Sequence, residues 1–405
     1  MGRRTAGTKG AVAAGDPATA RAAAELLAAG GSACDAALAG MLAACVAEPV
    51  LCSLGGGGFL LSVPADGEPP RIFDFFSQTP GRKRPADGRD PDFRRVTVDF
   101  GAATQDFHIG RAAAAVPGLP AGLFAVHAAR GRLPLAEVAR PAIALARAGH
   151  PIGDFQALLM RIVAPIMMAS AESRALMADP ADPERPAPAG TLRRLPAFAE
   201  TLEAMVEEGP RYFYEGPPAQ GLAAQARAGG LLTDRDLGDY RVAARAPLTL
   251  EALGSRVLTN PAPSAGGALI AAQLAVLDRL APGLDGPEPF AAAIAAAMGV
   301  AVEGRRTSGL AEAEDADGIE AATARLLDPL ALDRMAGRAR KIGGTTHISV
   351  VDAEGDLAAL SISNGEGNGD IIPGTEQMMN NMLGEEDLNP RGFFEWREGS
   401  RIASM

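Results

Sequence analysis

The chain has 405 residues, 47% hydrophobic and 21% charged, a composition typical of a globular protein with a large core. Its formal net charge of −11 argues against nucleic acid or an anionic membrane as the main partner. We find no apolar run long enough to span a bilayer and no apolar signal segment after the basic N-terminus. We therefore expect a cytoplasmic protein.

Several kinds of site lack their characteristic pattern. The glycine run 55–58 is followed by Phe59, not by the Lys and Ser/Thr of a phosphate-binding loop. None of the three lysines lies in a strongly apolar setting, which argues against a Schiff base. The three cysteines are expected to be buried apolar side chains. The histidines show no metal-ligand spacing: His108, His127, His150 and His347. We expect no metal and no other cofactor.

The first quarter of the chain predicts two helices and then two strands. Asp16 is a good N-cap, and Pro17 occupies the first helical position. Ser32 caps a second helix, which Pro49 ends. The predicted elements are helices at 18–29 and 32–47 and strands at 59–63 and 71–75.

The middle of the chain is largely helical and contains no internal repeat. Its richness in Pro, Ala and Asp predicts an exposed loop at 179–190. Thr233 and Asp236 mark a short helix start before Tyr240. The other predicted helical segments are 112–150, opened by a turn at 116–118, a helix from about 268 after the breaker cluster 260–267, and most of 290–340.

A β-hairpin is predicted where the composition changes at Gly343-Gly344. Residues 345–352 are β-branched and strand-like, and a second strand follows at 356–363. Gly355 suits the left-handed position of a three-residue hairpin loop. This loop places Thr345 opposite Ser363, where Cβ atoms lie roughly 4.5–5.5 Å apart. Two hydroxyls therefore meet where the hairpin begins.

The paired hydroxyls have two interpretations. If Thr345 becomes a chain terminus, its α-amino group, with a pKa of about 7.7–8.0, can take the proton of its own hydroxyl. Ser363 would then orient the nucleophile, and the two glycines before Thr345 would let the backbone bend. In the other interpretation the two residues are ordinary cross-strand partners, which the local pattern alone favours.

The hairpin and a series of motifs before it resemble the γ-glutamyltranspeptidase family. Residues 343–352, with Asn364 and Asn380-Asn381 downstream, look like the start of that family's small subunit. Six earlier segments follow in family order: 27–37, 46–49, 54–59, 116–118, Asp236-Leu237 with Tyr240, and 263–267. The resemblance runs from about residue 11 to the end. It implies an α/β fold, the four-layer αββα sandwich of N-terminal nucleophile hydrolases.

The resemblance also implies a self-processing precursor. Residues 1–344 would be the large-subunit region and 345–405 the start of the small-subunit region, incomplete. Self-cleavage at Gly344–Thr345 would release Thr345 as the nucleophile, with Ser363 as its hydroxyl partner. The processed pair of chains would act on a small-molecule γ-glutamyl substrate, with an amino acid, a peptide or water as acceptor.

The resemblance also implies substrate-binding residues, which are the residues of this chain that match family positions. Asn364, or Gly365 if the register differs by one, matches an asparagine that binds the substrate α-amino group. Glu385 matches an acidic ligand of the same ammonium, although it also fits a solvated loop acid. Ser404 matches one of two serines that hold the α-carboxylate, and Ala403 replaces the other.

Three departures from the family pattern leave the activity open. Phe76 follows Asp74-Phe75 where members have a carboxylate-binding arginine. Arg82 or Arg84 could replace that arginine, although both are more typical of surface charges. Met382 stands in place of a glutamine. The chain stops at residue 405, before the Gly-Gly pair of the oxyanion hole, as a truncated product would. The possible functions are a γ-glutamyl hydrolase or transferase, a related β-lactam-acylase-like amide acylase, and a non-catalytic truncated remnant.

Overall fold

The computed structural model describes residues 9–101, 104–280, 286–310, 313, 316–328, 345–389 and 391–402. The chain divides into two compact units. The first comprises Met1–Ala244 with Gly344–Glu386, and the second Arg245–Gly343 with Asp387–Met405. The boundary between units therefore differs from the predicted boundary between large and small subunits, because the segment after Gly344 folds into the first unit.

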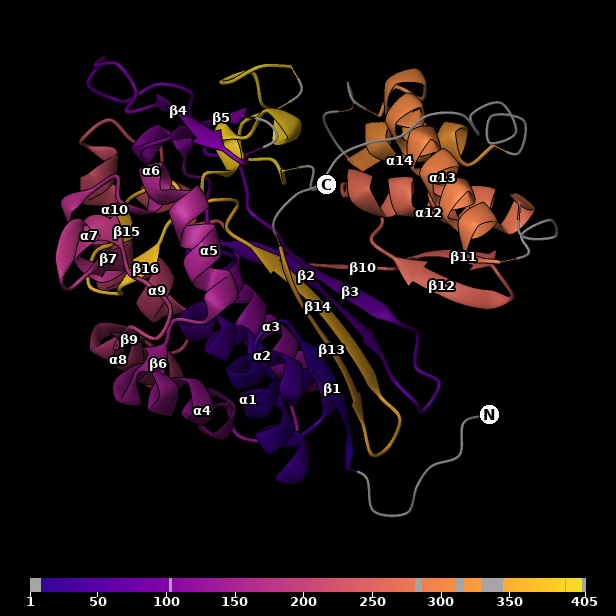
Figure 1. Cartoon of the computed structure of the whole chain (residues 1–405), viewed down its shortest axis with the longest axis horizontal. Helices are drawn as coiled ribbons and strands as arrows, with labels where there is room; N and C mark the ends of the chain where they lie inside the picture. The colour runs from indigo at the N-terminus through magenta and orange to yellow at the C-terminus, as the bar shows by residue number, and fades with distance from the viewer. Residues whose placement is uncertain are drawn as a thin grey trace. The chain divides into compact units, whose positions relative to one another are not determined.

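A six-stranded sheet organises the first unit (Figure 1). Its strand order is β1-β13-β14-β2-β3-β10, and every neighbouring pair from β1 to β3 is antiparallel. The strands are β1 (Gly10–Ala14), β13 (Thr346–Asp352), β14 (Leu357–Ser363), β2 (Gly57–Val63), β3 (Arg71–Phe75) and β10 (Ala243–Arg245). The hairpin predicted near the C-terminus is thus inserted between strands from the first 75 residues.

The first two helices begin and end almost where the sequence predicts. In α1 (Pro17–Ala28) the Asp16 carboxylate accepts a hydrogen bond from the amide of Ala18. In α2 (Ala33–Ala47) Ser32 and Asp35 form a reciprocal capping box. Every residue of α2 is buried, because it packs against α1, against α4 (Leu135–Ala148) and against the hairpin strands. This helix fixes one face of the hairpin in the core.

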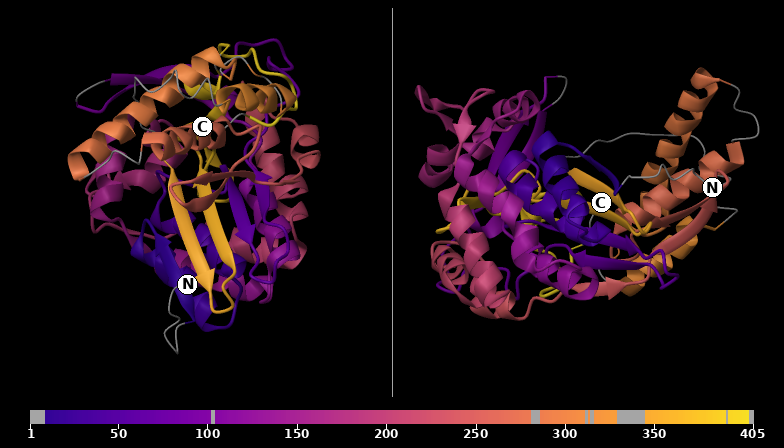
Figure 2. Two further views of the ribbon diagram at one scale, coloured as in Figure 1. Left: turned by 90° about the vertical axis from the view of Figure 1, so that its right-hand side faces the viewer. Right: turned by 90° about the horizontal axis from the view of Figure 1, so that it is seen from below.

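The β13–β14 hairpin has the predicted register. Thr346 pairs with Ile362 and Val351 with Leu357, and the two strands run side by side in the left view of Figure 2. Gly355 has φ 94°, the left-handed conformation expected of it. The Asp352 carboxylate closes the loop by accepting hydrogen bonds from three successive amides, those of residues 354–356.

Other parts of the first unit were not predicted or were predicted wrongly. The segment 179–190 is not a plain loop, since β7 and β8 form a small hairpin there. The strand β1 escaped prediction because its five small residues show no apolar alternation. The remaining elements are β4 (Arg94–Asp99), β5 (Thr104–Ile109), α3 (Leu119–Arg130), β6 (His150–Pro151), α5 (Asp154–Ile162), α6 (Ala164–Met167), α7 (Ala171–Met177), β7 (Ala178–Asp179), β8 (Asp182–Pro186), β9 (Leu192–Arg193), α8 (Pro196–Glu208), α9 (Arg211–Glu215), α10 (Pro217–Ala226), α11 (Asp234–Gly238), β15 (Ile371–Ile372) and β16 (Gln377–Met378).

In its described residues, the second unit contains a strand pair and three α-helices. Its elements are β11 (Leu248–Ala252), β12 (Ser255–Thr259), α12 (Ala265–Leu280), α13 (Pro287–Thr307) and α14 (Ala316–Leu326). The helix α12 begins three residues before the predicted start, inside the breaker cluster. Among the residues that the structure describes, no helix combines the length and apolar character needed to cross a membrane.

Candidate active site

The predicted nucleophile lies directly before the first paired residue of β13. Thr345 is exposed, and the alternation along β13 buries Thr346 and exposes His347. Continuing the β13–β14 register by one residue beyond the Thr346–Ile362 pair brings Thr345 opposite Ser363, as predicted. Ser363 is half-buried, and its Oγ accepts a hydrogen bond from the amide of Gly365 at 3.0 Å. The catalytic roles of Thr345 and Ser363 remain predictions, but the strand geometry they require is present.

The glycine run 55–58 lets the backbone pass close to the end of β14. A β-carbon on Gly56 would overlap the carbonyl oxygen of Ser363, and one on Gly58 would overlap that of Ser361. A β-carbon on Gly55 would overlap the carbonyl oxygen of Met378. These glycines are needed for close packing around the candidate site.

The predicted ammonium-binding residues come together at the turn after β14. Gly365 has φ +64°, and a β-carbon there would overlap Glu385 Oε1 and Asn381 Oδ1. Glu385 is half-buried, so it is not simply a solvated loop acid. Asn364 is fully buried, and its carbonyl accepts hydrogen bonds from the amides of Gly367 at 3.2 Å and Asn381 at 3.3 Å. Asn364 and Gly365 were the two candidates for the ammonium-binding position. Gly365 is the one whose backbone lies against Glu385.

Asn380 ties this turn to the glycine run. Its Nδ2 donates to the carbonyl oxygens of Gly55 at 2.7 Å and Ala115 at 3.0 Å. Its Oδ1 accepts from the amides of Ala115 at 3.0 Å and Met382 at 3.1 Å. Asn380 and Met382 are both buried. This one amide side chain therefore fixes three separate segments around the candidate site.

Glu366 was missed by the sequence reasoning. Its amide donates to Asn381 Oδ1 at 3.1 Å, which holds it beside Gly365 and Glu385. Its Oε2 is excluded from solvent and has no hydrogen-bond partner among the described residues. Burial raises the pKa of Glu366 to about 7. An acid between two glycines, three residues after the predicted hydroxyl partner, was the available signal.

A second buried carboxylate lies under the start of β13. Glu48 Oε2 accepts a hydrogen bond from Thr346 Oγ1 at 2.7 Å, and Oε1 accepts one from Thr19 Oγ1 at 2.7 Å. All three residues are buried. Burial raises the pKa of Glu48, while the two hydroxyl donors act in the opposite direction. The sequence reasoning named 46–49 only as a family landmark and gave Glu48 no role.

The position of the missing arginine is apolar. Phe76 is buried and stacks on Phe59 with ring centroids 5.4 Å apart, and its carbonyl accepts a hydrogen bond from the Tyr240 hydroxyl at 2.8 Å. Arg82 Nε donates to the carbonyl of Leu231 at 2.8 Å, and its Nη2 contacts two neighbouring carbonyls. Arg84 is exposed. The guanidinium of Arg82 is therefore engaged by the loop at 230–232.

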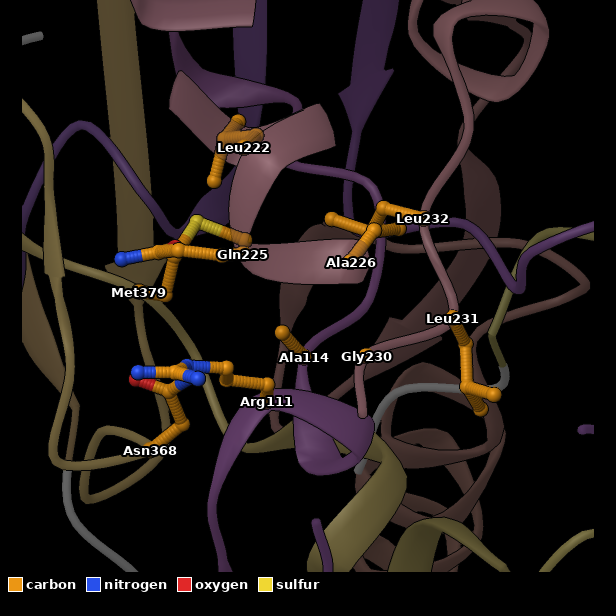
Figure 3. A pocket seen from close by; sticks show the side chains of 10 residues that line it. All are labelled: Arg111, Ala114, Leu222, Gln225, Ala226, Gly230, Leu231, Leu232, Asn368 and Met379. Carbon is orange, nitrogen blue, oxygen red and sulfur yellow. The ribbon is translucent and has the colours of Figure 1, made fainter. Parts of the chain in front are cut away.

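Three further observations limit the site. Ser404 and Ala403, like Gly343 and Gly344, lie outside the described residues. A pocket elsewhere in the first unit has Arg111, Gln225 and Asn368 as its polar lining (Figure 3). None of the predicted site residues lines it. Within the described ranges, no group of three His, Cys, Asp or Glu side chains is arranged to hold a metal ion.

Comparison with known proteins identifies the family. The family model described as gamma-glutamyltranspeptidase matches residues 19–400. A glutathione hydrolase proenzyme from Pseudomonas aeruginosa is 30% identical over 94% of this chain and 69% of its own length. An Acylase ACY 1 proenzyme from a Pseudomonas species is 29% identical over 98% and 73%.

Solved structures agree with this match. A cephalosporin acylase from Bacillus halodurans has a TM-score of 0.79 at 22% identity, covering all of this chain (100%) and 75% of that one, which shows a common fold. A gamma-glutamyltranspeptidase from Pseudomonas nitroreducens has a TM-score of 0.65 at 27% identity, covering 82% and 94%. The chain therefore belongs to the gamma-glutamyltranspeptidase family.

Proposed function

We propose that the protein is a γ-glutamyl hydrolase or transferase for glutathione-like γ-glutamyl amides, acting through an acyl-enzyme on Thr345. The observation that carries the proposal is the register of the β13–β14 hairpin. This register brings Thr345 opposite Ser363, at one end of two central strands of the six-stranded sheet. The chain belongs to a family with the proposed activity. A free Thr345 amine supplies a base near neutral pH without a histidine or lysine.

Maturation precedes turnover in this proposal. The Thr345 hydroxyl oxygen attacks the Gly344 carbonyl carbon, the Gly344–Thr345 C–N bond breaks, and the hydroxyl proton passes to the departing nitrogen. Water then hydrolyses the resulting ester, leaving a carboxylate on Gly344 and a free amine on Thr345. In turnover the Thr345 amine takes the hydroxyl proton, the oxygen attacks the γ-carbonyl carbon, the substrate's amide C–N bond breaks, and the leaving amine receives the proton. An acceptor amine or water releases the acyl group from Thr345.

The turn after β14 is the proposed site for the substrate ammonium. Glu385 supplies the negative charge, and the backbone at Asn364 and Gly365 forms the wall beside it. Ser404 is the proposed ligand of the α-carboxylate. No cofactor takes part in the proposed chemistry.

A second candidate function is hydrolysis of an amide whose acyl group lacks the α-carboxylate. Two observations favour it. Phe76 provides a buried aromatic surface stacked on Phe59 where a carboxylate-binding arginine is expected. Glu366 adds a second carboxyl group next to Gly365 and Glu385, which disfavours an anionic acyl group when it is ionised. The relative named as an acylase supports this alternative.

We also propose the complete four-layer αββα sandwich for the fold. The six-stranded sheet and the helices α1 and α2 on its buried face supply one sheet layer and one helical layer. The opposite face of β13 carries the exposed side chains of His347 and Ser349. In the proposed sandwich, a second sheet covers this face.

The deciding experiment is maturation of the full-length gene product. Wild-type protein should separate into two chains on a denaturing gel, and the new N-terminus should read Thr345-Thr346-His347. Thr345→Ala should remain one chain, whereas Thr345→Ser, which keeps a hydroxyl nucleophile, should still be cleaved. Normal cleavage of Thr345→Ala would refute the nucleophile. A wild-type protein that is neither cleaved nor active would support the non-catalytic alternative.

A further inference from the structure

The start of β13 is held by the sheet on one side only. The pairing of β13 with β14 extends to Thr346, whereas its pairing with β1 stops at Ile348, opposite Ala14. Cleavage before Thr345 would turn this segment into a chain terminus, and free termini fray unless they are tied down. The candidate nucleophile therefore needs an anchor from another layer of the fold.

Glu48 is placed to supply that anchor. It follows α2, and its backbone is fixed by its amide, which donates to the Ala44 carbonyl at 2.7 Å. Its carbonyl accepts from the amides of Leu51 at 2.9 Å and Cys52 at 3.1 Å. Glu48 is only 2% exposed, and its carboxylate accepts a hydrogen bond from the Thr346 hydroxyl at 2.7 Å. A side chain on a rigid, fully buried helix end thus holds the residue next to Thr345.

The chain after β1 leaves room for this contact. A β-carbon on Gly15 would lie 2.9 Å from Glu48 Oε2 and 3.4 Å from Thr346 Oγ1. Glycine at this position lets the end of β1 close over the hydrogen bond and shield it from water. A charge-assisted hydrogen bond excluded from water is stronger and geometrically tighter than an exposed one.

We propose that Glu48 is a positioning residue that fixes the Thr345 nucleophile through its hydrogen bond to Thr346. The proposal rests on the proposed function for the role of Thr345. Thr346 points to the buried side of β13 and Thr345 to the other side, so Glu48 acts on the backbone of the nucleophile and not on the substrate. Its loss should lower the rate of the chemical steps and leave substrate binding largely unchanged.

The two threonines on Glu48 provide a matched pair of variants. Thr346→Val and Thr19→Val each remove one hydroxyl donor at 2.7 Å from the same carboxylate, with little change in side-chain volume. Only Thr346 adjoins the nucleophile. In the full-length gene product, Thr346→Val should slow self-cleavage and reduce kcat by about ten- to a hundredfold, with KM changed less than about threefold. Thr19→Val should slow either step less than about threefold, and Thr346→Ser should restore both.

Equal slowing by Thr19→Val and Thr346→Val would overturn the proposal, because Glu48 would then serve only core stability. Near-wild-type rates in Thr346→Val would overturn it as well. If wild-type protein is not cleaved, the proposed function fails, and hydrogen–deuterium exchange still tests the anchor. Thr346→Val should then speed exchange in the peptide covering 345–350 at least about tenfold, and Thr19→Val should not. Unchanged exchange in both variants would refute anchoring independently of activity.

Discussion

Replacing Glu366 by Gln should stabilise the protein in a strongly pH-dependent way. Burial raises the pKa of Glu366 from an ordinary 4.5 to about 7, so the folded state binds this proton more tightly than the unfolded chain does. Stability is therefore lost as pH rises from 4.5 towards 7, and the full cost persists above pH 7. Linkage gives a cost of about 1 kcal/mol at pH 5 and about 3 kcal/mol at pH 8. Glutamine removes the titration while keeping the shape.

The measurement is urea unfolding followed by circular dichroism at pH 5 and pH 8. The gain in unfolding free energy of Glu366→Gln over wild type should be larger at pH 8 by about 2 kcal/mol. The matched control is Glu386→Gln, an exposed acid in the same region, which should change stability by less than about 0.5 kcal/mol at either pH. A gain that is equal at the two pH values would refute the buried, proton-binding state of Glu366.

Three further variants test other parts of the site. Ser363→Ala should slow self-cleavage and turnover with the fold intact by circular dichroism; wild-type kinetics would mean that the predicted hydroxyl pair has no role. Phe76→Arg should shift the preference between a γ-glutamyl and a glutaryl anilide towards glutamyl by about ten- to a hundredfold, since one charge-assisted contact contributes roughly 1.5–3 kcal/mol. An unchanged ratio would show that position 76 does not set specificity. Asn380→Ala should lower the unfolding free energy by about 2–4 kcal/mol, because it leaves buried groups of Gly55 and Ala115 unpaired. A loss below about 0.5 kcal/mol in urea unfolding would contradict the three-segment clamp.

Local signals in the sequence were sufficient for the elements that have strong caps or tight turns. The caps at Asp16 and Ser32, the short helix at Thr233, and the hairpin loop at Gly355 each depend on neighbouring residues, and each was predicted correctly. The fold class and the family came from ordered motifs, which composition alone would not have provided.

Contacts between residues far apart in the sequence could not be predicted from local signals. The landmark containing Glu48 was recognised, but nothing local shows that its carboxylate meets Thr346, almost 300 positions later. The burial of Glu366 likewise depends on Asn381 and the turn around it. The hairpin at 178–186 was missed because prolines and aspartates normally indicate loops, and tertiary packing overrode that preference. Ser404 lies outside the described residues, so its predicted role stays a prediction.

The strand order has a consequence for synthesis on the ribosome. In the part of the chain that the structure describes, β1 is an edge strand paired with β13 alone, and Gly10 pairs with Asp352, about 340 residues later. At about 5–20 residues per second, the N-terminal strand waits roughly 20 to 70 seconds for its partner to be made. During that time β2 also lacks β14 on one side. The nascent chain thus presents unpaired strand edges until β13 and β14 emerge, and its yield in cells should depend on chaperones that cover such edges.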